Sequence, residues 1–329
     1  MGKTAAIAER LLAGGDAAGR DEALWLARSA PFDELLFGAN RLRSGFRDDV
    51  VHLCSVVNAK SGACPEDCAF CAQSARYETS ADVYPLVPEA EMTSRAWAAA
   101  ERGADHFGIV TSGESACANR GDFETICAAA EAIGRAGAVE PCVSIGRLEP
   151  ADLDRLKAAG LRRIHHNLET SERFYPQICT THSHADRVAT VRNAKAAGLE
   201  VCCGGLFGLG ETWADRVDLA LRLRQLDVDS VPINFLNPVP GTPLGGRPLL
   251  EPREALRIIA LFRFVLPGRT IKVCGGREVT LRDLQSWMFA AGASGTMIGH
   301  YLTTAGRDAA DDLQMLADLG LTPKRRDHD

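Results

Sequence analysis

The chain has 329 residues, a formal net charge of −6 and eleven cysteines. A chain of this length buries enough surface to fold without disulfides, and an odd number of cysteines cannot form a complete disulfide framework. The acidic balance argues against nucleic acid as a partner, and no apolar run approaches the roughly 18 residues of a membrane span. Residues 1–15 lack an apolar signal core. We therefore expect a cytoplasmic protein with reduced thiols and no membrane association.

Short apolar or β-branched runs alternate with amphipathic helical stretches along the chain. The candidate strands are residues 50–58, 106–112, 140–146, 162–168, 200–208, 230–236, 270–276 and 295–300. The candidate helices between them are residues 89–104, 122–137, 151–160, 184–198, 214–226, 252–266 and 280–293. Strands at a spacing of about 30 residues, each followed by a helix, predict an α/β fold of the (β/α)8 TIM-barrel type. A doubly wound open sheet is the alternative.

Two further helical segments, residues 21–30 and 32–46, precede the first strand. We expect an N-terminal helical extension over residues 1–46 that covers the lower end of the barrel. The barrel itself is predicted over residues 47–321. The polar residues 322–329 are expected to form a frayed tail.

Three cysteines follow the first predicted strand with the spacing Cys-x3-Cys-x2-Cys: Cys64, Cys68 and Cys71. The position after a strand places them at the face of the barrel where active sites lie. Thiolates are the ligands of iron–sulfur clusters. Three thiolates can hold three irons of a [4Fe–4S] cluster and leave the fourth iron for a small molecule. A structural zinc site and unligated buried cysteines are the alternatives.

This spacing is the signature of the radical SAM enzymes, and the surrounding sequence resembles the biotin synthase family. The matching stretches are CPEDCAFCAQSARY (64–77), HHNLETS (165–171), TTHSHADRV (180–188), VCCGGLFGLGET (201–212), SVPINFLNPVPGTPL (230–244), GGREVTLRDLQ (275–285) and YLTTAG (301–306). The resemblance covers about residues 30–321 in collinear order. It implies a radical sulfurtransferase that inserts sulfur into dethiobiotin. It also implies a [4Fe–4S] cluster, S-adenosylmethionine, an electron donor such as flavodoxin or ferredoxin, and a homodimer.

The resemblance assigns a binding role to individual residues. Asn167 and Glu169 match positions that hydrogen-bond the ribose of S-adenosylmethionine, and Arg187 matches the arginine that pairs with its carboxylate. A guanidinium fork suits a carboxylate. Gly205 and Gly208 belong to the glycine-rich edge that meets adenine, although a tight strand exit explains such glycines equally well.

The substrate side is matched as well. Asn234 corresponds to an amide that contacts the ureido ring of dethiobiotin, and Thr303 and Thr304 to hydroxyls that contact its carboxylate tail.

The sequence departs from the familiar family pattern at a second, auxiliary cluster. The resemblance implies a [2Fe–2S] cluster that donates sulfur and is held by three cysteines and an arginine. Cys142 and Cys202 are two of these cysteines, but Gly108 stands at the position of the third and Lys272 at that of the arginine. Lysine and arginine are not equivalent at a ligand position.

Two additional thiols lie near these positions. Cys274 follows Lys272 by two residues, so both share one face of the strand, whereas Cys203 adjoins Cys202 and points to the other face. We therefore expect Cys142, Cys202 and Cys274 to hold the auxiliary cluster, either [2Fe–2S] or larger. Cys203 is the alternative ligand.

Other interpretations stay open. One is another radical SAM enzyme for cofactor maturation or a mutase reaction, and another is a non-catalytic iron–sulfur or zinc-binding protein. Cys54, Cys127 and Cys179 are interpreted as small packing residues.

Overall fold

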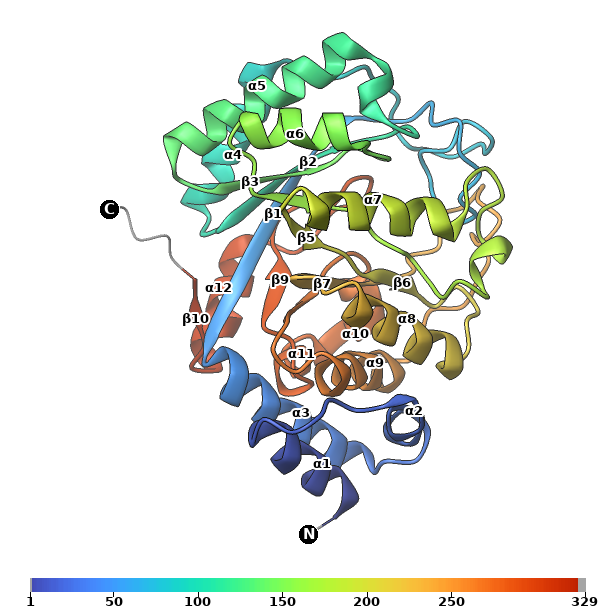
Figure 1. Ribbon diagram of the computed structural model, residues 1–329, viewed down its shortest axis with the longest axis vertical. Helices are drawn as coiled ribbons and strands as arrows, with labels where there is room; N and C mark the ends of the chain where they lie inside the picture. The colour runs from blue at the N-terminus through green and yellow to red at the C-terminus, as the bar shows by residue number, and fades with distance from the viewer. Residues whose placement is uncertain (1, 325–329) are drawn as a thin grey trace.

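The computed structural model describes residues 2–324, in which parallel strands close into a barrel surrounded by helices (Figure 1). The strands are β1 (Val50–Lys60), β2 (His106–Thr111), β3 (Glu140–Ser144), β4 (Arg163–His165), β5 (Glu200–Cys202), β6 (Gly205–Phe207), β7 (Ser230–Phe235), β8 (Thr270–Val273) and β9 (Gly295–Met297). They follow the order β1-β2-β3-β4-β5-β7-β8-β9, and β1 pairs with β9 to close the ring. All these pairings are parallel. The prediction of a (β/α)8 barrel is confirmed.

The predicted strand 200–208 is divided into two short strands. β5 ends at Cys202, and β6 starts at Gly205 and pairs with β7. A side chain at Gly204 would place its Cβ 1.9 Å from the carbonyl oxygen of Pro232. Only glycine allows the chain to pass so close to the next strand.

Helices cover the outside of the barrel. They are α4 (Glu89–Glu101), α5 (Arg120–Ala136), α6 (Pro150–Ala158), α7 (His184–Ala196), α8 (Trp213–Gln225), α9 (Pro252–Val265), α10 (Arg277–Leu281), α11 (Trp287–Ala290) and α12 (Ala309–Asp318), with the short 3₁₀ turns η1 (Ala116–Ala118), η2 (Tyr175–Gln177) and η3 (Arg282–Leu284). Local sequence explains several boundaries: capping boxes start α7 at Ser183 and α8 at Thr212, and Gly137 ends α5 with a φ of 73°. The prediction of one helix over residues 280–293 is wrong, because Arg282 has a φ of 51° and interrupts it. Helix α12 was not predicted.

The N-terminal helices lie together beside α9 and α11 (Figure 1). They are α1 (Lys3–Leu12), α2 (Arg20–Arg28) and α3 (Phe32–Arg47). Helix α3 packs against α9 and α11, and α2 against α8 and α9. Helix α1 was not predicted, although Ile7, Ala8 and Leu11 have helical spacing and are buried.

The end of the described chain is paired rather than frayed. Residues Thr322–Pro323 form β10, which lies parallel to the start of β1. The amide of Thr322 donates to the carbonyl of Asp49 at 2.8 Å, and that of Lys324 to Val51 at 2.8 Å. The prediction of a frayed tail is therefore wrong for residues 322–324, and residues 325–329 lie outside the described part.

Side chains along β1 point alternately to the apolar core around the barrel and to a cavity inside the barrel. Val51, Leu53 and Val57 belong to the main apolar core, whereas Cys54 and Val56 line a cavity inside the barrel. Between residues 2 and 324, no helix has both the length and the apolar character that crossing a membrane requires.

Candidate active site

The three-cysteine loop begins where β1 ends at Lys60. Cys64 is held in the loop by its amide, which donates to the carbonyl of Gln73 at 3.0 Å. The amide of Cys71 donates to the carbonyl of Cys68 at 2.9 Å, which turns the chain between these two ligands. All three cysteines line one cavity of about 210 Å³. Three thiols on a common cavity fit the donor set of a [4Fe–4S] cluster with one open corner.

A second loop, residues 178–182, holds the cysteine loop in place. The carboxylate of Asp67 accepts hydrogen bonds from the amides of Thr180 at 2.9 Å and Thr181 at 3.2 Å. The amide of Ala69 donates to the carbonyl of Ile178 at 2.8 Å. Burial opposes the ionisation of Asp67, but the hydrogen bonds from Thr180 and Thr181 outweigh it and lower the pKa of this carboxyl. Two segments distant in sequence are therefore hydrogen-bonded into one wall of the cavity.

Asn167, Glu169 and Arg187 lie together on the same cavity. Arg187 donates from Nη1 to the carbonyl of Asn167 at 3.0 Å and from Nε to the hydroxyl of Tyr175 at 2.6 Å. Its Nη1 lies 3.7 Å from a carboxylate oxygen of Glu169. Burial raises the pKa of Glu169, and the nearby Arg187 opposes this shift. The group presents a fixed guanidinium and a carboxylate to the cavity, as a ligand with both a carboxylate and a diol requires.

Gly205 and Gly208 have a structural explanation. Neither lines this cavity or the larger one described next. A Cβ on Gly205 would lie 2.5 Å from the carbonyl oxygen of Glu169, which accepts a hydrogen bond from the amide of Leu206. Gly208 adopts a φ of 95°, and its amide donates to Glu211 at 3.1 Å. The structure thus uses the glycines for close backbone contact and a turn.

A larger cavity of about 390 Å³ occupies the barrel interior. Cys142 on β3, Cys202 at the end of β5 and Cys274 just after β8 all line it. Burial raises the pKa of both Cys142 and Cys274. Lys272 lines the cavity with Cys274, as the alternation predicted, whereas Cys203 belongs to the apolar core. The structure therefore brings together three thiols from three strands, a donor set that fits an iron–sulfur cluster.

Positive side chains accompany these thiols. Lys272 is 2 % exposed and, like Arg163, lines the cavity. Burial favours the neutral amine of Lys272, but the interactions with the sulfur atoms of Cys54 and Cys202 outweigh burial and raise the pKa of Lys272. A buried cation at this position would offset part of the negative charge of cysteines that bind a cluster as thiolates.

Asn234, Thr303 and Thr304 line the same large cavity. Asn234 bridges two strand ends: its Nδ2 donates to the carbonyl of Gly205 at 3.2 Å, and its Oδ1 accepts from the amide of Gly275 at 3.0 Å. A side-chain amide has two N–H groups and two lone pairs, so one of each is left for a ligand. Cys71, Asn167 and Glu169 line both cavities, so the two cavities adjoin at these residues.

Sequence reasoning missed two thiols of the site. Cys54 lines the large cavity, and its Sγ lies 2.7 Å from Nζ of Lys272. Cys179 lies behind the cysteine loop, with its Sγ 3.8 Å from that of Cys68. The alternation along β1 could have placed Cys54 inside the barrel. No local pattern indicates the contact of Cys179, because it joins segments that are 111 residues apart.

Known proteins resemble this chain over nearly its full length. The Radical SAM superfamily profile matches residues 59–223, and the profile of the Biotin and Thiamin Synthesis associated domain matches residues 232–322. The biotin synthase of Geobacter sulfurreducens is 54% identical over 321 residues, which cover 97% of each chain. That of Syntrophotalea carbinolica is 52% identical over 322 residues, which cover 97% of this chain and 98% of the relative.

Solved structures agree on the architecture. A methylornithine synthase superposes with a TM-score of 0.82 at 21% identity and covers 97% of each chain. This likeness shows the fold alone, because the identity is low. The family follows from the sequence relatives: since their identity extends over almost the whole chain and both profiles match, the chain belongs to the biotin synthase family of radical SAM enzymes.

Proposed function

We propose that this chain inserts sulfur into dethiobiotin to form biotin, in a radical reaction that depends on S-adenosylmethionine. The observation that supports this most directly is the junction of the two cavities. Cys71, Asn167 and Glu169 line both of them. A radical formed beside the cysteine loop can therefore meet a substrate held inside the barrel without leaving the protein.

Cys64, Cys68 and Cys71 would hold a [4Fe–4S] cluster. When bound, this cluster supplies the electron that cleaves S-adenosylmethionine. Asn167 and Glu169 would bind the ribose. Arg187 would bind the methionine carboxylate, since Tyr175 and the backbone of Asn167 already fix its guanidinium.

Cys142, Cys202 and Cys274 would hold an auxiliary cluster, either [2Fe–2S] or larger. When bound, it supplies the sulfur atom. Lys272 would offset the charge of the thiolates from inside the barrel, next to Cys54.

Asn234 would orient dethiobiotin by its ureido ring, with its remaining N–H and lone pair. Thr303 and Thr304, which line the same cavity, would contact the carboxylate tail. These contacts would position the two carbons that receive sulfur near the junction of the cavities.

The setting of the reaction rests on the family resemblance. We propose a homodimer in the cytoplasm that receives electrons from a flavodoxin or ferredoxin. Residues 1–46 would form a helical extension, and residues 47–321 the catalytic barrel.

Anaerobic reconstitution with iron and sulfide, followed by addition of dethiobiotin, S-adenosylmethionine and a low-potential reductant, tests this function. Biotin and 5′-deoxyadenosine should both appear. Cys71→Ala should abolish both products, whereas Cys127→Ala, which changes a core thiol outside both cavities, should retain them. A loaded chain that cleaves S-adenosylmethionine but forms no biotin would exclude the proposal.

A further inference from the structure

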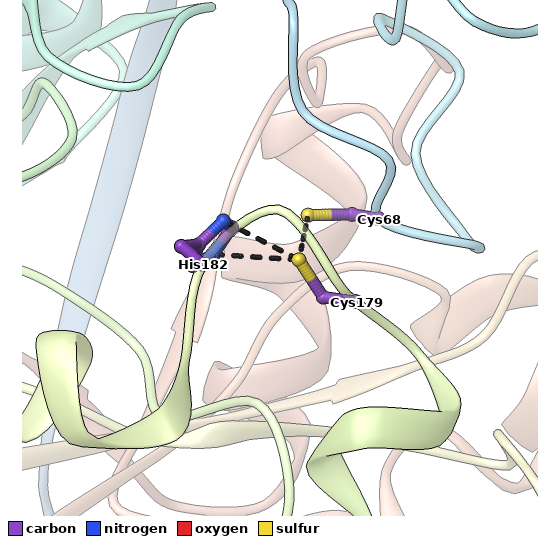
Figure 2. A group of neighbouring side chains, drawn as sticks. All are labelled: Cys68, Cys179 and His182. Atoms are coloured by element: carbon purple, nitrogen blue, oxygen red, sulfur yellow. Dashed lines mark hydrogen bonds between the residues drawn. The ribbon is translucent and has the colours of Figure 1, made fainter.

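Cys179 and His182 have no role in the proposed reaction, but both lie beside the cluster cysteine Cys68. Figure 2 shows the three side chains converging from the cysteine loop and from the segment that holds it. The Sγ atoms of Cys68 and Cys179 are 3.8 Å apart. The Sγ of Cys179 lies 3.3 Å from Nδ1 of His182 and 3.8 Å from its Nε2. Cys68 and Cys179 are buried, and His182 is half-buried.

These distances match the edges of a tetrahedral metal site. Two thiolates that each bind Zn²⁺ at about 2.3 Å are about 3.8 Å apart in a tetrahedron. A thiolate and an imidazole nitrogen on the same ion are about 3.5 Å apart. The separation of Cys68 and Cys179 agrees with the first value. Nε2 of His182 lies 3.8 Å from Sγ of Cys179, slightly beyond the second. One ligand atom from each of the three residues can be chosen so that all three lie within 4.8 Å of one another.

Glu66 would orient the histidine of such a site. Its carboxylate oxygen lies 2.5 Å from Nδ1 of His182. A carboxylate on one ring nitrogen of a histidine fixes the tautomer and leaves the other nitrogen for a metal. The remaining corner of the tetrahedron is left for water.

We propose that Cys68, Cys179 and His182 form a binding site for a single divalent ion such as Zn²⁺ in the cluster-free chain. The ion and the [4Fe–4S] cluster exclude each other, because both require the thiolate of Cys68. This exclusion rests on the proposed role of Cys68, whereas the ion site itself does not. Binding takes both cysteines as thiolates and involves no change of oxidation state.

The test titrates the full-length, iron-free chain with Co²⁺ under anaerobic conditions and then displaces it with Zn²⁺. The wild type should bind one equivalent of Co²⁺ with a thiolate charge-transfer band that Zn²⁺ removes. Cys179→Ala and His182→Gln should each weaken Zn²⁺ binding by at least about tenfold. Both variants should still take up as much iron as the wild type on reconstitution, because Cys64, Cys68 and Cys71 are intact.

Cys64→Ala should give the opposite result: this variant should lose the cluster but retain the Zn²⁺ site. The matched control is Cys127→Ala, which removes a buried thiol remote from both cavities and should change neither property. Undiminished Zn²⁺ binding by Cys179→Ala, or by Cys179→Ser if the alanine variant does not fold, would overturn the proposal. The ion would then be held by other thiols of the iron-free chain, in the cysteine loop or in the barrel interior. Failure of the proposed function would appear separately, as a reconstituted wild-type chain that makes no biotin.

Discussion

Nζ of Lys272 lies 2.7 Å from Sγ of Cys54, although β9 separates their strands, β8 and β1. The register explains this contact, because Gly295 of β9 pairs with Lys272 on one side and with His52 on the other. A Cβ at Gly295 would lie 2.8 Å from Cγ of Lys272. Because Gly295 has no side chain, the aliphatic part of Lys272 can pass over β9, and its buried ammonium group reaches the thiol of Cys54.

The first prediction concerns this glycine. Gly295→Ala should lower the free energy of unfolding by about 1–3 kcal/mol, because the new methyl group overpacks against Lys272 and the carbonyl of His52. Gly268→Ala is the control: its Cβ would meet no atom within 4 Å, so the change should stay within about 0.5 kcal/mol. Urea unfolding of the iron-free chain measures both. Equal stabilities of the two variants would contradict the crossing described above.

The second prediction ranks Cys274 and Lys272. Cys274→Ser should remove iron beyond that of the first cluster and block biotin formation, because a hydroxyl does not replace a thiolate ligand. Cleavage of S-adenosylmethionine should partly survive, since the first cluster is untouched. Lys272→Ala should retain more of the additional iron, because an ammonium has no lone pair for a metal.

Iron and sulfide analysis with product assays measures this ranking, and Cys127→Ser serves as a control for loss of a thiol outside the cavities. If Lys272 proves essential and Cys274 dispensable, the lysine itself occupies the position of the arginine ligand. The larger auxiliary cluster would then be abandoned.

The sequence predicted the barrel well because each strand is a local apolar run followed by a local helical pattern. Alternation within one strand also placed Lys272 and Cys274 together inside the barrel. The division between β5 and β6 was not predicted, since it depends on the approach of Gly204 to Pro232 of another strand. The break at Arg282 was not predicted either. Nearby, Arg277 of α10 forms a buried ion pair with Asp312 of α12, a helix that was itself not predicted.

In the candidate site, too, local motifs were predicted and contacts between distant segments were not. The spacing of Cys64, Cys68 and Cys71 is a local motif and indicates its chemistry directly. Cys179 has no motif of its own, and only the folded chain reveals that it lies against Cys68. A thiol whose partner is remote in sequence is therefore easily interpreted as a packing residue.

The third prediction tests Arg187 on α7. Arg187→Lys cannot keep both the contact to Tyr175 and that to the carbonyl of Asn167, because an ammonium lacks the planar fork. We expect the KM for S-adenosylmethionine to rise by roughly 10–100-fold, the equivalent of one lost charge-assisted hydrogen bond. Arg192→Lys on the same helix changes an exposed arginine and should leave the KM unchanged. Similar KM values for the two variants would remove Arg187 from the binding site.

His106 gives the barrel a dependence on pH. Burial, with the positive charges of Lys272 and Arg163, lowers the pKa of His106 to about 3, although Asp105, 3.0 Å away, opposes this shift. The folded chain therefore keeps His106 neutral, whereas the unfolded chain binds a proton as the pH falls below about 6.5. Stability is unaffected by this group above that pH and is lost progressively between about 6.5 and 3.

The fourth prediction follows from that window. At pH 5, His106 alone should lower the free energy of unfolding by about 2 kcal/mol relative to pH 7.5. The reason is that pH 5 lies about 1.5 units below the pKa of about 6.5 in the unfolded chain, and each unit contributes about 1.4 kcal/mol. His106→Gln has no titrating group, so its loss of stability between the two pH values should be smaller by that amount. Urea unfolding of the iron-free wild type and variant at both pH values measures the difference. The same loss in both proteins would mean that His106 binds its proton equally in the folded and unfolded chains, and the buried neutral imidazole would have to be abandoned.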